Sequence, residues 1–258
     1  MAKKEDFISL FESIEDMACL LDEHWAIYSL DKEFAYFILF PNPVSSYNII
    51  NHQFLWQTYY EDALKIAKMP YKRFLTWSKS IEKNKNPPPT VMIQTSARSG
   101  STLFGGMLHH EGYSVVYGEP PIFSVLVVGY VTKYWDEKRL KPKNIKEYAF
   151  CFYMGPYVLY RKHQDLFDMP IIWYDQVVNN TEETLASVFK AISQNKSGLE
   201  MPETLLESAK SRLEVDSQQG TYISREKMKN VYVTPKNEEN MKRIYEFAEI
   251  FEIPKEWL

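Results

Sequence analysis

Apolar side chains recur along the first part of the chain at the spacing of helices. Residues 7–21 carry one every three or four positions, and residues 54–67 repeat this spacing, which is typical of helices with one buried face. Between them, residues 34–40 are apolar at every position, so we expect a buried segment that is either helix or strand. The sequence therefore predicts a helical, aromatic-rich N-terminal portion.

A break in this pattern follows the second predicted helix. Residues 79–86 are rich in charge, and they lead into three consecutive prolines at positions 87–89, which interrupt regular structure. We therefore treat residues 1–258 as a single domain with a helical portion over 1–88 and a second portion over 89–258.

The second portion alternates predicted strands with predicted helices. Short apolar runs at residues 90–94, 113–117 and 169–175 are typical of buried strands, and the segment over 103–110 has the character of a helix. Such alternation is typical of a parallel sheet flanked by helices, so the predicted fold class is α/β. Further helices are expected over residues 122–134, 149–162, 181–192 and 237–251.

The turn between the first of these strands and its helix contains candidate binding chemistry. It reads Thr-Ser-Ala-Arg-Ser-Gly-Ser-Thr over residues 95–102. Gly100 lets the backbone approach a ligand closely, and the free N–H groups that begin the helix, from about Ser101 onward, favour an anion. The turn therefore predicts a phosphate or sulfate site, and an ordinary turn of small residues is the alternative.

This turn resembles a known phosphosulfate-binding loop. The ATPase fingerprint is not met, because Thr95 stands in place of its first glycine and Ser101 in place of its lysine. A strand that leads into T-x-x-R-S-G-S-T-L and a helix resembles the loop of sulfotransferases that use 3′-phosphoadenosine 5′-phosphosulfate. The resemblance implies a P-loop-like nucleotide-binding fold in which Arg98 supports the leaving phosphate. It also implies that the phosphate oxygens are held by Ser99, Gly100, Ser101 and Thr102.

Three further stretches extend the resemblance. Glu119 ends the second predicted strand and is followed by proline, where a carboxylate in this family can accept the proton of the acceptor. Residues 216–225 stand where the family has a late loop over the 3′-phosphate, which assigns Ser224 and Arg225 to the co-substrate. Residues 172–176 resemble the family's Y-E-D-L strand but have Asp175-Gln176 in place of Glu-Asp. For each stretch an ordinary surface loop or strand end is the alternative.

One part of the family pattern is missing. Sulfotransferases have an Arg and a Ser that bind the 3′-phosphate between the first strand–helix unit and the Y-E-D strand. The span over 121–170 is short and contains only Arg139 and Arg161, with its single serine, Ser124, before both. The chain therefore resembles an abridged sulfotransferase.

Three functions remain open from the sequence. The first is transfer of a sulfuryl group from 3′-phosphoadenosine 5′-phosphosulfate to a small-molecule hydroxyl acceptor, with Glu119 as base and Arg98 at the leaving phosphate, and without a metal. The second is a non-catalytic nucleotide-binding or interaction protein. The third is an ATP-dependent kinase or ATPase, in which Asp175 at the end of a strand would hold magnesium.

The composition indicates which binding partners and which cellular compartment to expect. A net charge of −4 and a pI near 5.8 give no support to nucleic-acid binding, and 45% hydrophobic residues indicate a folded chain. Cys19 and Cys151 are too few for a disulfide framework, which favours a reducing compartment. The apolar run over 122–131 is too short to span a bilayer, and the charged N-terminus has no signal-peptide core. We therefore expect a soluble, cytoplasmic protein.

Overall fold

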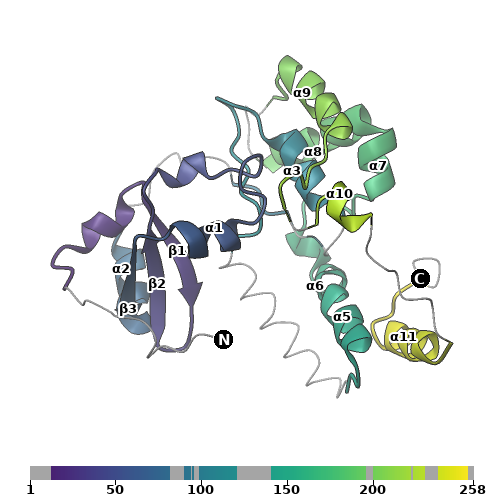
Figure 1. Ribbon diagram of the computed structural model, residues 1–258, viewed down its shortest axis with the longest axis horizontal. Coiled ribbons are helices and arrows are strands. Elements are labelled where there is room, and N and C mark those ends of the chain that lie inside the picture. Colours follow the sequence, from purple (N-terminus) through teal and green to yellow (C-terminus); the bar gives the residue numbers. More distant parts are fainter. Residues whose placement is uncertain are drawn as a thin grey trace.

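The computed structural model describes residues 13–81, 90–93, 95, 99–120, 141–195, 200–221, 223–229 and 238–254. Its helices and strands gather in three groups (Figure 1). The sheet and the helices of residues 55–80 lie at the left of the view, the helices of residues 101–108 and 174–228 at the upper right, and those of residues 145–162 and 238–250 at the lower right. Each group has its own cluster of buried apolar side chains.

The N-terminal group is built on an antiparallel sheet of order β1-β2-β3. Its strands and helices are η2 (Met17–Leu21), β1 (Trp25–Leu30), β2 (Phe34–Leu39), η3 (Val44–Ser46), α1 (Leu55–Asp62), β3 (Lys65–Pro70) and α2 (Tyr71–Ser80). The Asp31 carboxylate accepts hydrogen bonds from the backbone N–H groups of Glu33 (2.7 Å) and Phe34 (2.6 Å), which fixes the turn between β1 and β2. β2 is the central strand, because it pairs with β1 on one side and with β3 on the other.

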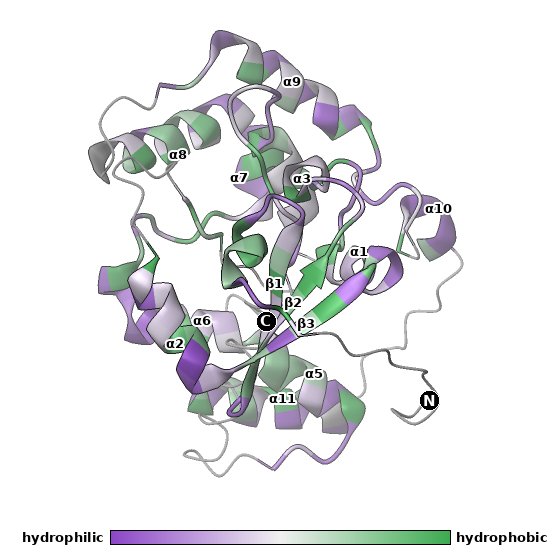
Figure 2. Cartoon of the chain, turned by 90° about the vertical axis from the view of Figure 1, so that its left-hand side faces the viewer, coloured by the Kyte–Doolittle hydropathy of each residue, from purple (hydrophilic) through white to green (hydrophobic). Residues whose placement is uncertain are grey.

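Both faces of β2 are buried, which explains why its sequence is apolar at nearly every position. Ala35 and Phe37 contribute to a cluster with Ala67 and Met69 of β3, and Phe74 and Trp77 of α2 pack against it. Residues of the opposite face join a second cluster with α1: Ile38, Phe40, Tyr47, Leu55 and Tyr59. Figure 2 shows the sheet with more of the hydrophobic colour than the exposed short helix α10.

The prediction of a helical N-terminal portion is wrong. The predicted helix over 54–67 ends at Asp62, and β3 begins at Lys65. The Leu64 N–H donates to the carbonyl oxygen of Leu39 at 2.9 Å, and β3 then pairs along the whole of β2. Pairing with a distant strand overrides the local helical spacing, because apolar periodicity alone does not record which partner a segment finds.

The prediction of an α/β fold with a parallel, P-loop-like sheet is also wrong. Every strand pair among the described residues is antiparallel and belongs to the N-terminal group. Residues 90–93 form no strand and their apolar side chains are exposed, residues 113–117 make only the isolated bridge between His110 and Ser114, and residues 169–173 form no strand. A short apolar run becomes a strand only when another strand pairs with it, and the described residues provide none here.

The second group is centred on α3. It contains α3 (Ser101–Leu108), α7 (Tyr174–Asn179), α8 (Thr181–Asn195), α9 (Glu203–Glu214) and α10 (Arg225–Met228). Its core includes Leu103, Phe104, Met107, Leu108, Leu185, Val188, Phe189 and Leu205. The predicted helices over 103–110 and 181–192 are thus present, and the predicted apolar residues of α3 are buried.

The third group joins α5 (Ile145–Tyr153), α6 (Gly155–Lys162), η4 (Gln164–Leu166) and α11 (Glu238–Ile250). Asn144 caps α5 by accepting hydrogen bonds from the backbone N–H groups of Lys146 and Glu147, each at 3.0 Å. The Arg161 guanidinium binds the carbonyl oxygen of Glu252 at 2.8 Å and its carboxylate at 2.9 Å. These contacts fasten α6 to the segment that follows α11. No helix within the described ranges is long and apolar enough to cross a membrane.

The two cysteines are expected to differ sharply in reactivity. Cys19 is exposed, whereas Cys151 is fully buried in the third group. Burial raises the pKa of the Cys151 thiol to about 11, with Glu147 adding to the rise and Arg243 opposing it. A thiol reagent at pH 8 should modify one cysteine in the folded protein and two in denaturant.

The same shift predicts a loss of stability at alkaline pH. The Cys151 pKa is higher in the folded chain than the ordinary thiol value of about 8.5, so the neutral thiol favours the folded state. This contribution is fully present below pH 8.5 or so and is lost as pH rises through about 11. Denaturation of Cys151→Ala over this range should show a flatter pH dependence. Equal slopes for both proteins would contradict the prediction.

Candidate functional site

The start of α3 has the backbone expected of an anion-binding turn. Gly100 stands at the N-cap in the left-handed conformation, with φ +83° and ψ +14°, and as a glycine it has no side chain that could cap the helix. The first N–H groups of α3 therefore have no acceptor within the helix, and the glycine at the N-cap supplies none. A Cβ atom at Gly100 would lie 2.4 Å from Cδ2 of Tyr174, so the ring of Tyr174 covers this turn. Position 100 requires glycine for both reasons.

The late loop meets this turn across a large separation in sequence. Gln218 Nε2 donates a hydrogen bond to Thr102 Oγ1 at 2.6 Å, and the two residues are 116 positions apart. The loop is held by its own bonds, because Asp216 Oδ1 accepts from the Gln218 N–H at 3.0 Å and Thr221 Oγ1 donates to the Gln218 carbonyl oxygen at 2.8 Å. The predicted anion turn and the predicted late loop thus lie together.

Gln218 is the residue of this contact that the sequence reasoning did not single out. It lies in a polar, glycine-containing loop that the resemblance placed near the co-substrate, but a glutamine carries no charge and fits no motif. In the sequence, only the position of Gln218 within this loop pointed to a contact with the predicted site.

The two predicted ligands in the late loop have other partners. Ser224 is buried, and its hydroxyl accepts a hydrogen bond from the backbone N–H of Lys227 at 3.4 Å as the N-cap of α10. The Arg225 guanidinium lies 4.0 Å from the carboxylate of Asp216, which also accepts from the Arg225 N–H at 2.7 Å. Arg98 lies outside the described residues, and the assignment of all three residues to a co-substrate stays a prediction.

Glu119 has an unusual backbone and a perturbed carboxyl group. Its φ is +48°, in a region that residues other than glycine rarely adopt. Burial raises the pKa of the Glu119 carboxyl, although the residue as a whole is exposed, and hydrogen bonding by the side chain of Trp56 lowers it by a smaller amount. A partly desolvated carboxylate is a better proton acceptor than a fully hydrated one.

Asp175 does not end a strand. It stands in the first turn of α7, and its side chain is exposed. The geometry that a magnesium-holding strand would provide is therefore missing at this position. Among the residues that the structure describes, no group of three or more acidic, histidine or cysteine side chains has the arrangement of a metal site.

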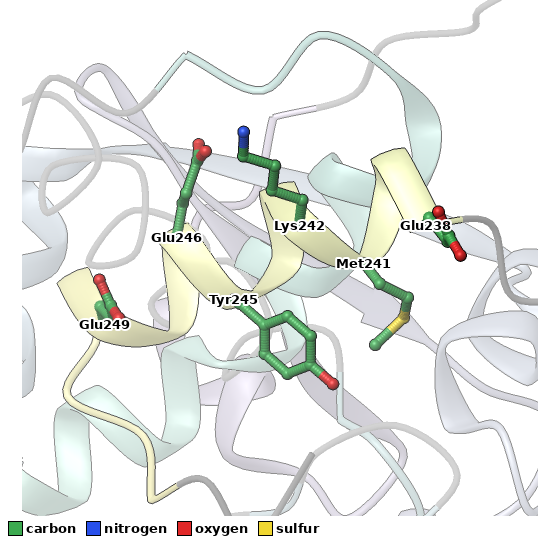
Figure 3. A pocket seen from close by; sticks show the side chains of 6 residues that line it. All are labelled: Glu238, Met241, Lys242, Tyr245, Glu246 and Glu249. Carbon is green, nitrogen blue, oxygen red and sulfur yellow. The ribbon is translucent and has the colours of Figure 1, made fainter.

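Among the residues that the structure describes, those that line a hollow on the surface of α11 all belong to that helix. Figure 3 shows its side chains pointing to different sides of the helix: Glu238, Met241, Lys242, Tyr245, Glu246 and Glu249. No second element of the described chain lines it, and none of the described residues predicted for the site does so.

Comparison with known proteins gives no match. No protein-family model, no curated protein and no solved structure is significantly similar to this chain. The turn at the start of α3, the late loop and Glu119 are therefore the basis for assigning a function.

Proposed function

We propose that this protein binds 3′-phosphoadenosine 5′-phosphosulfate at the start of α3 and transfers its sulfuryl group to a hydroxyl acceptor. The observation that supports this most directly is the contact between Gln218 and Thr102, which brings the late loop to the turn that the sequence predicts to bind an anion. The left-handed Gly100 and the uncapped N–H groups of α3 suit the phosphate beside the transferred group.

The proposed residues act on two reacting groups, the acceptor hydroxyl and the leaving phosphate. The acceptor oxygen forms a bond to sulfur as the bond between sulfur and the donor phosphate oxygen breaks. Glu119 takes the proton of the acceptor hydroxyl, and Arg98 with the α3 N–H groups stabilises the negative charge on the departing adenosine 3′,5′-bisphosphate. Ser99, Ser101 and Thr102 supply hydroxyl groups to the same phosphate.

A second candidate is a protein that binds the nucleotide without transferring sulfate. The exposure of Val91, Met92 and Ile93 favours it, because residues 90–93 are then not a buried strand that would hold the turn in place. The pairing of Arg225 with Asp216 also reduces the positive charge that the late loop offers to a 3′-phosphate.

Calorimetry with adenosine 3′,5′-bisphosphate tests binding at the turn. Gly100→Ala should weaken binding at least tenfold, because the new methyl group would meet the Tyr174 ring. Gly112→Ala is the matched control: Gly112 also has positive φ, +75°, but nothing in the described part of the chain lies within 4 Å of its Cβ position. Each substitution places alanine at a positive φ, which costs about 1 kcal/mol of stability. Only Gly100→Ala should also change the affinity for adenosine 3′,5′-bisphosphate. Absence of heat with the unmodified protein would contradict both candidate functions.

Transfer of radiolabelled sulfate to a library of hydroxyl compounds, in the presence of a chelator, separates the two candidates. Turnover that falls tenfold or more in Arg98→Ala supports the transferase, since a lost charged hydrogen bond typically corresponds to about 1.5–3 kcal/mol. Tight binding without turnover supports the binding protein. Activity unaffected by Arg98→Ala would contradict the proposed role of the turn.

A further inference from the structure

A short segment, residues 116–118, joins the N-terminal group to the group centred on α3. The Ile49 N–H donates a hydrogen bond to the Val116 carbonyl oxygen at 2.8 Å, and the Leu55 N–H donates to the Gly118 carbonyl oxygen, also at 2.8 Å. Both donors belong to the N-terminal group, because Ile49 precedes α1 and Leu55 begins it. We call residues 116–118 the joining segment.

Two glycines allow the close packing at this place. A Cβ atom at Gly118 would lie 2.2 Å from the carbonyl oxygen of Gln53. In α3, a Cβ atom at Gly105 would lie 2.5 Å from Cδ1 of Ile49 and 3.3 Å from Cγ1 of Val116. The joining segment, α3 and the chain that leads into α1 therefore meet at one place.

A histidine side chain binds the joining segment from the side of α3. His109 is the C-cap of α3, and its ring Nδ1 accepts a hydrogen bond from the Val116 N–H at 3.3 Å. The chain turns back between these two residues, with the bridge between His110 and Ser114 inside the turn. Val116 is therefore hydrogen-bonded to the end of α3 through its N–H and to Ile49 through its carbonyl oxygen.

The donor in this contact fixes the protonation of the His109 ring. A backbone N–H can only donate, so Nδ1 is the unprotonated nitrogen and the ring is neutral, with its proton on Nε2. Protonation would place a second N–H on Nδ1, facing the N–H of Val116, and two donors cannot bond to each other. The contact therefore exists only while His109 is neutral.

The surroundings of His109 favour the neutral ring. Burial is the largest cause that lowers the pKa of His109, and the positive charges of Arg212 and of protonated His110 lower it further, whereas Glu111 raises it. Arg212 acts from α9, which packs against α3. No other charged group in the described part of the chain shifts this pKa. The ring is thus neutral at pH 7, and the contact with Val116 is formed.

We propose that His109 is a pH-sensitive switch that attaches the joining segment to α3 when its ring is neutral and releases it when the ring is protonated. The joining segment carries the hydrogen bonds to Ile49 and Leu55, so its release weakens the attachment of the N-terminal group. The contribution to stability is fully present above the ordinary histidine pKa of about 6.5, and it is lost as pH falls through the lower pKa of the folded chain. This inference does not depend on the proposed function.

Nuclear magnetic resonance of the nitrogen-15 labelled protein tests the inference. At about pH 7.5, the couplings within the His109 ring should show a neutral imidazole with its proton on Nε2. The amide hydrogens of Val116, Ile49 and Leu55 should then be protected from exchange, and their protection factors should fall about tenfold at roughly pH 5. A proton on Nδ1 at the higher pH, or equal protection at both pH values, would overturn the inference.

Two substitutions at His109 separate its titration from its packing. His109→Asn keeps an acceptor oxygen near the place of Nδ1 and cannot titrate, so the Val116 amide should be equally protected at both pH values. His109→Phe removes the acceptor and should leave this amide weakly protected at both. His110→Gln is the matched control and should keep the pH dependence, because the His110 ring makes its contact with Thr204, at 2.9 Å.

A pH dependence that persists in His109→Asn would contradict the role of this ring. Full protection of the Val116 amide in His109→Phe would contradict it as well. If neither variant folds, the tautomer and the titration of His109 in the unmodified protein still decide the question.

Discussion

The Gly118→Ala substitution is expected to lower the free energy of unfolding by about 3 kcal/mol, at the upper end of the usual range for overpacking. The added methyl group would lie 2.2 Å from the Gln53 carbonyl oxygen, and 2.8 Å from its carbonyl carbon. These are backbone atoms, so no side-chain rotation relieves the overlap. Separation of the two segments would also break the hydrogen bond from the Leu55 N–H to the Gly118 carbonyl oxygen. Urea denaturation followed by tryptophan fluorescence measures the effect.

Gly106→Ala is the matched control, with an effect of opposite sign. Gly106 lies inside α3, and the nearest atom to its Cβ position is Cδ1 of Ile50 at 3.6 Å, an ordinary contact distance. Alanine favours the helix over glycine by roughly 0.5–1 kcal/mol, so this variant should be more stable than the unmodified protein. If both variants have the same midpoint of unfolding, the close approach at Gly118 is contradicted.

Helices with strong periodicity were predictable because one helix face decides their burial. The buried positions of α8 include Leu185, Val188 and Phe189, which recur at three or four residues, and the core of the second group accepts that face. The predicted segment over 237–251 likewise corresponds to α11. The apolar spacing that identifies α8 and α11 is local, so it can be read directly from the sequence.

Strands were not predictable in the same way, because a strand needs a partner elsewhere in the chain. Residues 90–93 have the apolar, β-branched composition of a buried strand, yet they are exposed and are not part of any strand within the described ranges. β3 has the sequence Lys-Ile-Ala-Lys-Met-Pro, which is far less apolar, and it pairs with β2 through six residues. The available partner, and not the composition, decided which segment joined the sheet.

The candidate site was predictable in part. The motif predicts that Gly100 lets the backbone approach a ligand closely, and this stays a prediction, while the left-handed conformation of Gly100 at the start of a helix comes from the structure. Gln218 contacts that turn, and the ring of Tyr174 lies over it. Both contacts depend on the tertiary fold, so neither could be predicted from the sequence. The same holds for the hydrogen bond from the Leu55 N–H to the Gly118 carbonyl oxygen, which joins the N-terminal group to residues beyond the predicted boundary.

The Glu147→Ala substitution should lower the free energy of unfolding by about 3 kcal/mol, because it removes the anion of a buried ion pair. Glu147 is 3% exposed, and its carboxylate accepts hydrogen bonds from the Lys143 N–H at 2.7 Å and from Asn144 Nδ2 at 3.1 Å. Arg243 Nε of α11 lies 3.7 Å from the same carboxylate. The variant leaves these donors without their acceptor, in the contact between α5 and α11.

The expected loss lies at the lower end of the range for buried pairs, since Arg243 keeps Glu246 as a second partner and its guanidinium still covers the Phe247 ring at 4.8 Å. Glu182→Ala provides the control. It removes an ion pair with Lys210 whose side chains are 65% and 56% exposed, and the expected change is below about 0.5 kcal/mol.

A double-mutant cycle separates the ion pair from the other contacts of Glu147. Glu147→Gln keeps the size of the side chain, and Arg243→Met keeps an apolar stem beside Phe247. If the two charges stabilise each other, the double variant should lose less stability than the sum of the single variants, by about 1 kcal/mol or more. Strict additivity would mean that Glu147 stabilises the protein through its hydrogen bonds to Lys143 and Asn144 and not through Arg243. The attachment of α11 would then depend on the apolar cluster around Cys151, Phe247 and Phe251.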